Sequence, residues 1–290
     1  MAAVHAITVE GADARRAREA VDAAVADVQR IEAKYSRYRD DSLLSRINRA
    51  AGVESVAIDD ETRALLDYAD RCHALSQGRF DVTSGVYRRA WDFRRDPPRV
   101  PAPEEIDALR ELVGWQHVER TAHTVHLRKP GMQLDFGGIG KEYAADRAAT
   151  LLKQHGIAHA LVNLGGDVRA IGAQASGAPW RIGIRHPREA EPAVIASVDV
   201  AEGAIATSGD YERFFEIDGR RYCHVIDALT GMPVSAWQSI SVAAPLAIVA
   251  GSCSTIAMLM GTEAPAFLRD QGVTWLGVDA SGCRVGSLDA

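Results

Sequence analysis

Apolar residues recur at helical spacing in three long stretches of the chain. In the first, Val21, Val25, Val28 and Ile31 share one face and charged residues separate them, which predicts a helix that packs on a core. In the last, almost every position is apolar, so that helix is expected to be buried. The three helices are predicted at residues 13–35, 61–76 and 246–260.

Shorter segments alternate in the way that strands do. Ala160, Val162 and Leu164 form one apolar face, and turn residues separate this segment from its neighbours. Strands are predicted at residues 6–9, 118, 125–127, 160–164, 180–184, 193–200 and 222–226.

Two glycine-rich turns enclose a helix and a strand between residues 134 and 172. Gly137, Gly138 and Gly140 lead into the helical pattern, and Gly165 and Gly166 follow the strand. If the strand packs back on the helix, the two turns lie close together. Their backbone N–H groups and the positive end of the helix favour a phosphate-bearing ligand. Glycine-rich turns that bind nothing are about as common, so both readings stay open.

The better known nucleotide-binding loops do not fit this region. A Walker loop needs Ser or Thr after its lysine, and here Glu142 follows Lys141. In a dinucleotide fingerprint that starts at Gly138, the third glycine position falls on Tyr143. The sequence therefore gives no support to a Walker-type nucleotidase or to a nicotinamide-dependent oxidoreductase.

The composition is that of an ordinary globular protein. Of 290 residues, 47% are hydrophobic and 25% are charged, and the formal net charge is -6. An acidic balance gives no footprint for nucleic acid, and the arginine pairs at 88–89 and 94–95 are predicted to be solvated faces. The four cysteines have no C-x-x-C spacing, so packing thiols are expected instead of a zinc site or a disulfide framework.

The sequence shows no sign of a membrane span or a signal peptide. No uninterrupted apolar run reaches membrane length, and the first residues lack a basic region followed by an apolar core. We therefore expect a cytoplasmic protein as the sequence stands, or a periplasmic one if a leader has been removed.

Six segments, taken in order, resemble the ApbE family of flavin transferases, whose activity is FAD:protein FMN transfer. No single segment is decisive, but six in the family's order are specific. They lie at residues 41–48 (DSLLSRIN), 80–85 (FDVTSG), 134–172, 206–216 (ATSGDYERFFE), 224–234 (HVIDALTGMPV) and 254–261 (STIAMLMG).

The resemblance implies a fold and an activity. The fold would be one domain over residues 1–290 of the mixed α+β class, with mixed sheets packed by helices and the ligand at the junction of two intimately packed subdomains. The activity would be a Mg²⁺-dependent transferase that splits FAD, joins FMN to a Thr or Ser hydroxyl of an acceptor flavoprotein, and releases AMP. Phosphoryl transfer of this kind needs positioning and charge neutralisation more than covalent help from the enzyme.

The same resemblance implies the residues of the site. An aromatic ring and a carboxylate at 80–81 could stack on a planar ring and bond a ribose, although Asp81 could equally cap the next helix. Tyr38 could be a half-buried aromatic, His224 a core histidine, and residues 206–210 either a tight turn or a place of close ligand approach. The expected cofactor residues are Tyr38, Arg79, Phe80, Asp81, Asp135, Lys141 and Ile226, and the expected catalytic residues are Lys141 and Thr255.

The metal site departs from the family. There, an Asp and a Thr four residues later on the last long helix hold Mg²⁺ with a carbonyl from the glycine-rich loop. Here Thr255 and Gly138 match, but Gly251 stands at the carboxylate position. A second departure is Glu142, where the family usually has glycine. Mg²⁺ is usually bound through one or two carboxylates, so the loss matters.

Three explanations for the missing carboxylate stay open. Glu142, Asp210 or Asp227 supplies the charge; the ion arrives with the pyrophosphate of FAD; or the chain binds FAD without transferring FMN. Glycine inside a helix is about 1 kcal/mol worse than alanine, so we expect the helix to tolerate Gly251→Asp. The new carboxylate would form an i, i+4 pair with Thr255 and tighten Mg²⁺ binding.

Overall fold

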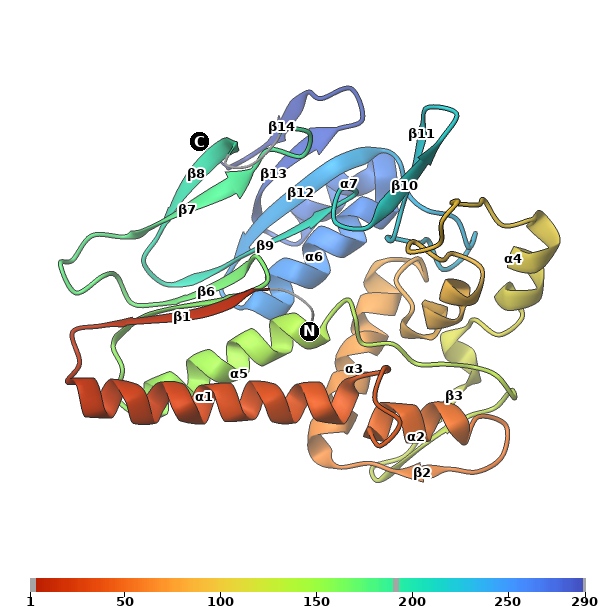
Figure 1. The fold of residues 1–290 in the computed structure, drawn as a ribbon, viewed down its shortest axis with the longest axis horizontal. Coiled ribbons are helices and arrows are strands. Elements are labelled where there is room, and N and C mark those ends of the chain that lie inside the picture. The colour runs from red at the N-terminus through yellow and green to blue at the C-terminus, as the bar shows by residue number, and fades with distance from the viewer. Residues whose placement is uncertain (1–3, 190–192, 289–290) are drawn as a thin grey trace.

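The computed structural model describes residues 4–189 and 193–288 and is built around one large antiparallel sheet (Figure 1). Helices and sheets together confirm the expected α+β class. Every pairing between the described strands is antiparallel, so the sheets are not mixed in strand direction as the resemblance implied. In spatial order the large sheet contains β1 (His5–Glu10), β5 (His159–Leu164), β6 (Asp167–Ile171), β9 (Gly203–Gly209), β12 (Trp237–Ala244), β13 (Thr274–Asp279) and β14 (Arg284–Gly286).

Four helices lie on one side of this sheet. α5 packs on β5 and β6, α6 packs on β9 and β12, and α1 and α7 flank them (Figure 1). The carboxylate of Asp146 on α5 accepts hydrogen bonds from the first two N–H groups of α6, both at 2.9 Å, which fixes one helix against the other. These helices are α1 (Ala14–Tyr35), α5 (Gly140–Gln154), α6 (Ala247–Met260) and α7 (Ala264–Asp270).

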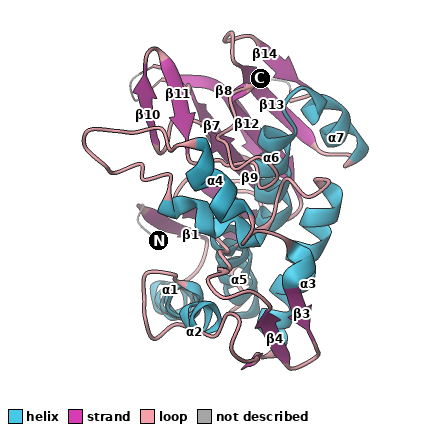
Figure 2. Ribbon diagram, turned by 90° about the vertical axis from the view of Figure 1, so that its right-hand side faces the viewer, coloured by secondary structure: helices cyan, strands magenta, loops and turns pink. Residues whose placement is uncertain are grey.

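The remaining elements are a small sheet, two hairpins and several short helical pieces. Figure 2 shows the small sheet at one end of the molecule and β13 and β14 at the other. The small sheet has the order β2 (Val56–Ala57), β4 (Thr124–Leu127), β3 (Val118–Arg120), and the two hairpins are β7 (Trp180–Arg185) with β8 (Val194–Val200) and β10 (Phe214–Ile217) with β11 (Arg220–Cys223). The helical pieces are α2 (Leu43–Arg49), α3 (Asp60–Leu75), η1 (Val82–Arg89), α4 (Pro103–Arg110), η2 (Trp115–His117) and η3 (Gly261–Glu263).

The three predicted helices are confirmed as α1, α3 and α6. Local chemistry explains where α1 and α3 begin and where α5 ends. Asp13 and Asp59 cap α1 and α3 through their carboxylates, and Gly156 takes the left-handed φ of +71° just after α5.

One turn prediction and one strand prediction are wrong in part. Residues 206–210 are neither a turn nor a loop for most of their length, because 206–209 belong to the central strand β9. The strand expected at 222–226 ends at Cys223, and Ile226 makes only an isolated bridge with Pro233. In β9 the small residues that suggested a turn allow α6 to pack closely on the sheet.

The run Ala247–Asp270, which includes α6 and α7, is long and apolar enough to cross a membrane by length and composition alone. It is the only such helix among the described residues, and 61% of its apolar window is buried inside the protein. α6 packs on the large sheet beside α5, so this run is the core helix that the hydrophobic pattern predicted.

Candidate functional site

The glycine-rich loop before α5 is held on two sides. The carboxylate of Asp135 accepts from the N–H of Gly137 at 2.8 Å and pairs with Arg37 at 2.8 Å and Arg88 at 3.0 Å. A Cβ at Gly138 would come within 2.8 Å of the Phe80 ring, so glycine at this position lets the ring pack on the loop backbone.

Lys141 connects the two glycine-rich turns. Its Nζ lies 2.8 Å from Oδ2 of Asp167 and 3.4 Å from the carbonyl oxygen of Gly165. This contact confirms that the two turns lie close together. Burial acts to lower the pKa of Lys141, but the neighbouring carboxylates of Asp167 and Glu142 outweigh it and the pKa is raised. Lys141 is therefore a cation at neutral pH.

Glu142 projects from the same turn of α5 toward α6. A Cβ built on Gly251 would lie 2.4 Å from Cγ and 3.0 Å from Oε1 of Glu142. Burial and the charge of Asp167 raise the pKa of Glu142. The expectation that the helix tolerates Gly251→Asp is therefore wrong, because Glu142 already fills the space in front of Gly251.

Hydroxyl groups line the same part of α6. Ser208 on β9 lies 2.9 Å from Oγ1 of Thr255 and 2.8 Å from Oγ of Ser254. Thr255 follows Gly251 by one helical turn, so positions 251 and 255 share a face. The structure thus brings together Lys141, Gly251 and Thr255 at the junction of α5, α6 and β9.

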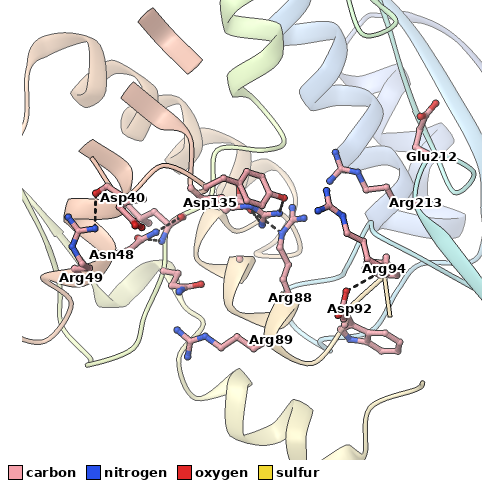
Figure 3. Close-up of a pocket in the computed structure, with 18 of the residues that line it drawn as sticks. Asp40, Asn48, Arg49, Arg88, Arg89, Asp92, Arg94, Asp135, Glu212 and Arg213 are labelled. Atoms are coloured by element: carbon pink, nitrogen blue, oxygen red, sulfur yellow. Dashed lines mark hydrogen bonds and ion pairs between the residues drawn. The ribbon is translucent and has the colours of Figure 1, made fainter. Parts of the chain in front are cut away.

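An arginine-rich cleft of about 840 Å³ lies next to the Asp135 loop (Figure 3). Figure 3 shows Arg88, Arg94 and Arg213 turned toward one region of the cleft, with Arg88 bonded to Asp135. The prediction of solvated faces holds for Arg89, Arg94 and Arg95, which are exposed, but Arg88 is half-buried in its ion pair with Asp135. The charged residues that line the cleft are Arg37, Asp40, Arg49, Arg88, Arg89, Asp92, Arg94, Asp135, Glu212 and Arg213.

Tyr38 also lines this cleft and is not half-buried, because 70% of its surface is exposed. The guanidinium of Arg37 lies over its ring, 4.5 Å from the centroid. Arg37 therefore touches both Tyr38 and Asp135. The ring is open to a ligand, and its role with FAD stays a prediction.

Asp81 has the surroundings of a structural residue. Its carboxylate caps η1 by accepting from the N–H and hydroxyl of Thr83, both at 2.7 Å, and it accepts from the N–H of Trp115 at 2.9 Å. Only 6% of Asp81 is exposed. The helix-cap alternative describes this side chain, whereas Phe80 next to it packs against the glycine-rich loop.

A third group of expected residues lies around Asp227. Arg79 pairs with this carboxylate at 2.6 Å, and Ile226 precedes it in the chain. The pKa of His224 is lowered to about 4, because desolvation disfavours its charged form and the cations Arg213, Arg88 and Lys141 repel it. His224 is therefore neutral at neutral pH, and it is half-buried instead of fully buried in the core.

The arginines are what the sequence reasoning missed. Arg37, Arg88 and Arg213 come from three separate parts of the chain, and only the fold brings them to one cleft. The available signal was Asp135, a carboxylate directly after an apolar segment, which needs cationic partners if it is partly buried.

Comparison with known proteins agrees with this arrangement. The model of the ApbE family matches residues 1–276. The FAD:protein FMN transferase of Salmonella typhimurium is 35% identical over 276 residues, covering 92% of this chain and 79% of that protein. The one from Treponema pallidum is 36% identical and covers 87% of this chain and 74% of its own length.

Solved structures give the same result for the fold. The ApbE protein of Thermotoga maritima superposes with a TM-score of 0.87 at 32% identity, covering 98% of this chain and 97% of that one. The apo flavinyl transferase ApbE of Pseudomonas stutzeri superposes with a TM-score of 0.86 at 28% identity, covering 98% of this chain and 90% of that one. With its fold, its glycine-rich loop and nearly its whole length matched, this chain belongs to the ApbE family.

Proposed function

We propose that this chain is an FAD:protein FMN transferase. A Thr or Ser hydroxyl of an acceptor flavoprotein attacks the FMN phosphorus of FAD, the pyrophosphate bond breaks, and AMP leaves. The hydroxyl proton departs, and the acceptor gains an FMN phosphoester. Family membership over residues 1–276 is the observation that carries the proposal, and it favours transfer over the alternative of FAD binding alone.

The site's own residues suit a pyrophosphate substrate. Arg88, Arg94 and Arg213 give the cleft cations that bind phosphate oxygens through paired N–H groups. Lys141, held by Asp167 at the start of α5, places a fixed positive charge beside the glycine-rich loop. These groups neutralise and orient the phosphates, which is the main demand of phosphoryl transfer.

The junction of α5 and α6 fits a divalent cation such as Mg²⁺, which we include in the proposal. A buried oxygen of Glu142 has no hydrogen-bond partner in the described part of the chain, the carboxylate of Asp167 lies beside Glu142, and the Thr255 hydroxyl lies on the adjacent helix face. No group of three His, Cys, Asp or Glu residues gathers within the described residues. Carbonyl, phosphate and water oxygens would complete the coordination, as is usual for Mg²⁺, and the ion would neutralise phosphate charge.

The test is transfer itself. The protein is incubated with FAD, Mg²⁺ and a flavin-acceptor domain, and the intact mass of the acceptor and the AMP released are measured. We expect one FMN per acceptor and an equal amount of AMP, and no adduct when the acceptor hydroxyl residue is replaced by alanine. No adduct and no AMP, under conditions where the Salmonella relative modifies the same acceptor, would overturn the proposal.

A further inference from the structure

We infer that Glu142 on α5 supplies the carboxylate for the divalent cation, in place of residue 251 on α6. Relative to the pattern that the family resemblance implies, the carboxylate is on α5 and the glycine is on α6. The inference rests on the proposed function, because the ion belongs to the transfer reaction.

The first support is steric. An ideal Cβ on Gly251 would lie 2.4 Å from Cγ, 3.0 Å from Cδ and 3.0 Å from Oε1 of Glu142. The carboxyl group of Glu142 therefore lies where any side chain at position 251 would project. A carboxyl group from α5 thus lies in the space in front of position 251 on α6.

The second support is an unpartnered oxygen. Glu142 is 6% exposed, and within the described residues its Oε2 is buried without a hydrogen-bond partner. Leaving a buried acceptor without a donor is costly, and native proteins seldom do so without a reason. Asp167 lies beside Glu142 and adds negative charge to this space, although its Oδ2 already pairs with Lys141 at 2.8 Å. A cation bound here would satisfy Oε2 of Glu142.

The third support is that the competing carboxylates are occupied. Asp210 receives two hydrogen bonds of 2.7 Å from Arg188 and one of 3.4 Å from Arg221. Asp227 pairs with Arg79 at 2.6 Å and accepts from the N–H of Leu229 at 2.8 Å. Of the three candidates that the sequence left open, only Glu142 has an oxygen free for an ion.

The experiment measures metal binding directly. Mn²⁺, a spectroscopic substitute for Mg²⁺, is titrated into the full chain with and without FAD, and free Mn²⁺ is followed by electron paramagnetic resonance. We expect the parent to bind Mn²⁺ and Mg²⁺ to displace it. Glu142→Gln keeps the shape but loses the charge, and should weaken binding by at least about tenfold, since even indirect partners of a metal matter that much.

Two further variants make the result specific. Glu119→Gln removes an equal charge from Glu119 on β3, which forms an exposed ion pair with Arg128. This variant should bind Mn²⁺ as the parent does. The exchange variant Glu142→Gly with Gly251→Asp moves the carboxylate back to α6 and should recover most of the affinity that Glu142→Gly alone loses. Thermal unfolding of each variant establishes that it is folded.

The outcomes separate this inference from the proposed function. A folded Glu142→Gln protein that binds Mn²⁺ as tightly as the parent overturns the inference. The inference is also overturned if Asp167→Asn loses Mn²⁺ affinity and Glu142→Gln does not. A parent that transfers FMN without binding Mn²⁺ overturns the inference and leaves the function standing. A parent that binds Mn²⁺ through Glu142 but transfers no FMN overturns the function alone.

Discussion

Two glutamates at the first turn of α5 differ in how their carboxylates are hydrogen-bonded. Glu61, on α3, accepts from Arg30 at 2.7 Å, from Lys34 at 2.6 Å and from the hydroxyl of Tyr143 at 2.8 Å. Glu142, the residue just before Tyr143, faces Gly251 with one oxygen unpartnered among the described residues. One helical turn therefore has a saturated carboxylate on one side and an unsatisfied one on the other.

The difference separates two uses of charge. Hydrogen bonding to Arg30 outweighs burial and, with Lys34 and Tyr143, holds the pKa of Glu61 well below its usual range. Glu61 thereby ties α1, α3 and α5 together with partners that the chain itself provides. Glu142 costs stability unless a partner comes from outside, which is the behaviour expected of a residue retained for binding.

The largest effect is expected at position 251. Gly251→Ala should destabilise the protein by about 3 kcal/mol, because its Cβ collides with Cγ of Glu142. In a Glu142→Gly background the same change should stabilise by about 1 kcal/mol, the ordinary preference of a helix for alanine. Urea unfolding of the four proteins checks this, and the same sign in both backgrounds would show that the two residues do not share space.

Glu61→Gln should give the next largest effect, a loss of about 2 kcal/mol of unfolding free energy, because hydrogen bonds to a charged group are lost at once. Urea unfolding measures the loss. A change below about 0.5 kcal/mol, as for a typical surface position, would mean that this cluster does not hold the three helices together.

The pH dependence tests the same carboxylate. The pKa of Glu61 is depressed from the ordinary value of 4.5, so its stabilisation is fully present above pH 4.5 and is lost as pH falls toward the lower folded-state pKa. Below pH 4.5 the parent should therefore lose stability faster than Glu61→Gln does. Melting temperatures between pH 3 and pH 7, on the scale of about 2 °C per kcal/mol, provide the measurement; parallel curves would contradict the assignment.

Glu142→Gln should have the smallest effect and the opposite sign. Without divalent ions, and at a pH above the raised pKa of Glu142, it should stabilise by about 1 kcal/mol, since it then removes a poorly compensated buried charge beside Asp167. Added Mg²⁺ should stabilise the parent more than the variant, by an amount that grows with the logarithm of ion concentration. Thermal melts in chelator and across a Mg²⁺ series check this, and equal Mg²⁺ responses would count against Glu142 as a ligand.

The sequence was sufficient for the helices but not for the middle of the large sheet. α1, α3 and α6 have apolar faces or continuous apolar runs that a periodic pattern detects. β9 and β12 are buried along most of their length and contain Ser, Thr, Ala and Gly, so neither shows the alternation of a half-buried strand. Small residues there serve the contact with α6, which only the fold shows.

The candidate site was predictable in its loop and not in its charges. Lys141 and the two glycine turns follow from local sequence, because a loop, a helix and a returning strand must bring them together. The arginines of the cleft come from separate elements, and which of Glu142, Asp210 and Asp227 has a free oxygen depends on contacts with Arg188 and Arg79. Such pairings depend on tertiary packing and leave no periodic trace.

The shared space of positions 142 and 251 restricts the mutational routes by which such a chain can diverge. Two single substitutions separate an arrangement with glycine at 142 and aspartate at 251 from the one present here. The intermediate with two side chains must force them into one volume, as the 2.4 Å approach at Gly251 shows. The intermediate with two glycines leaves room but lacks the carboxylate. A chain that changes from one arrangement to the other by single substitutions must therefore pass through the two-glycine form, which is stable but has a weakened site. Steric fit thus fixes the order of the two substitutions.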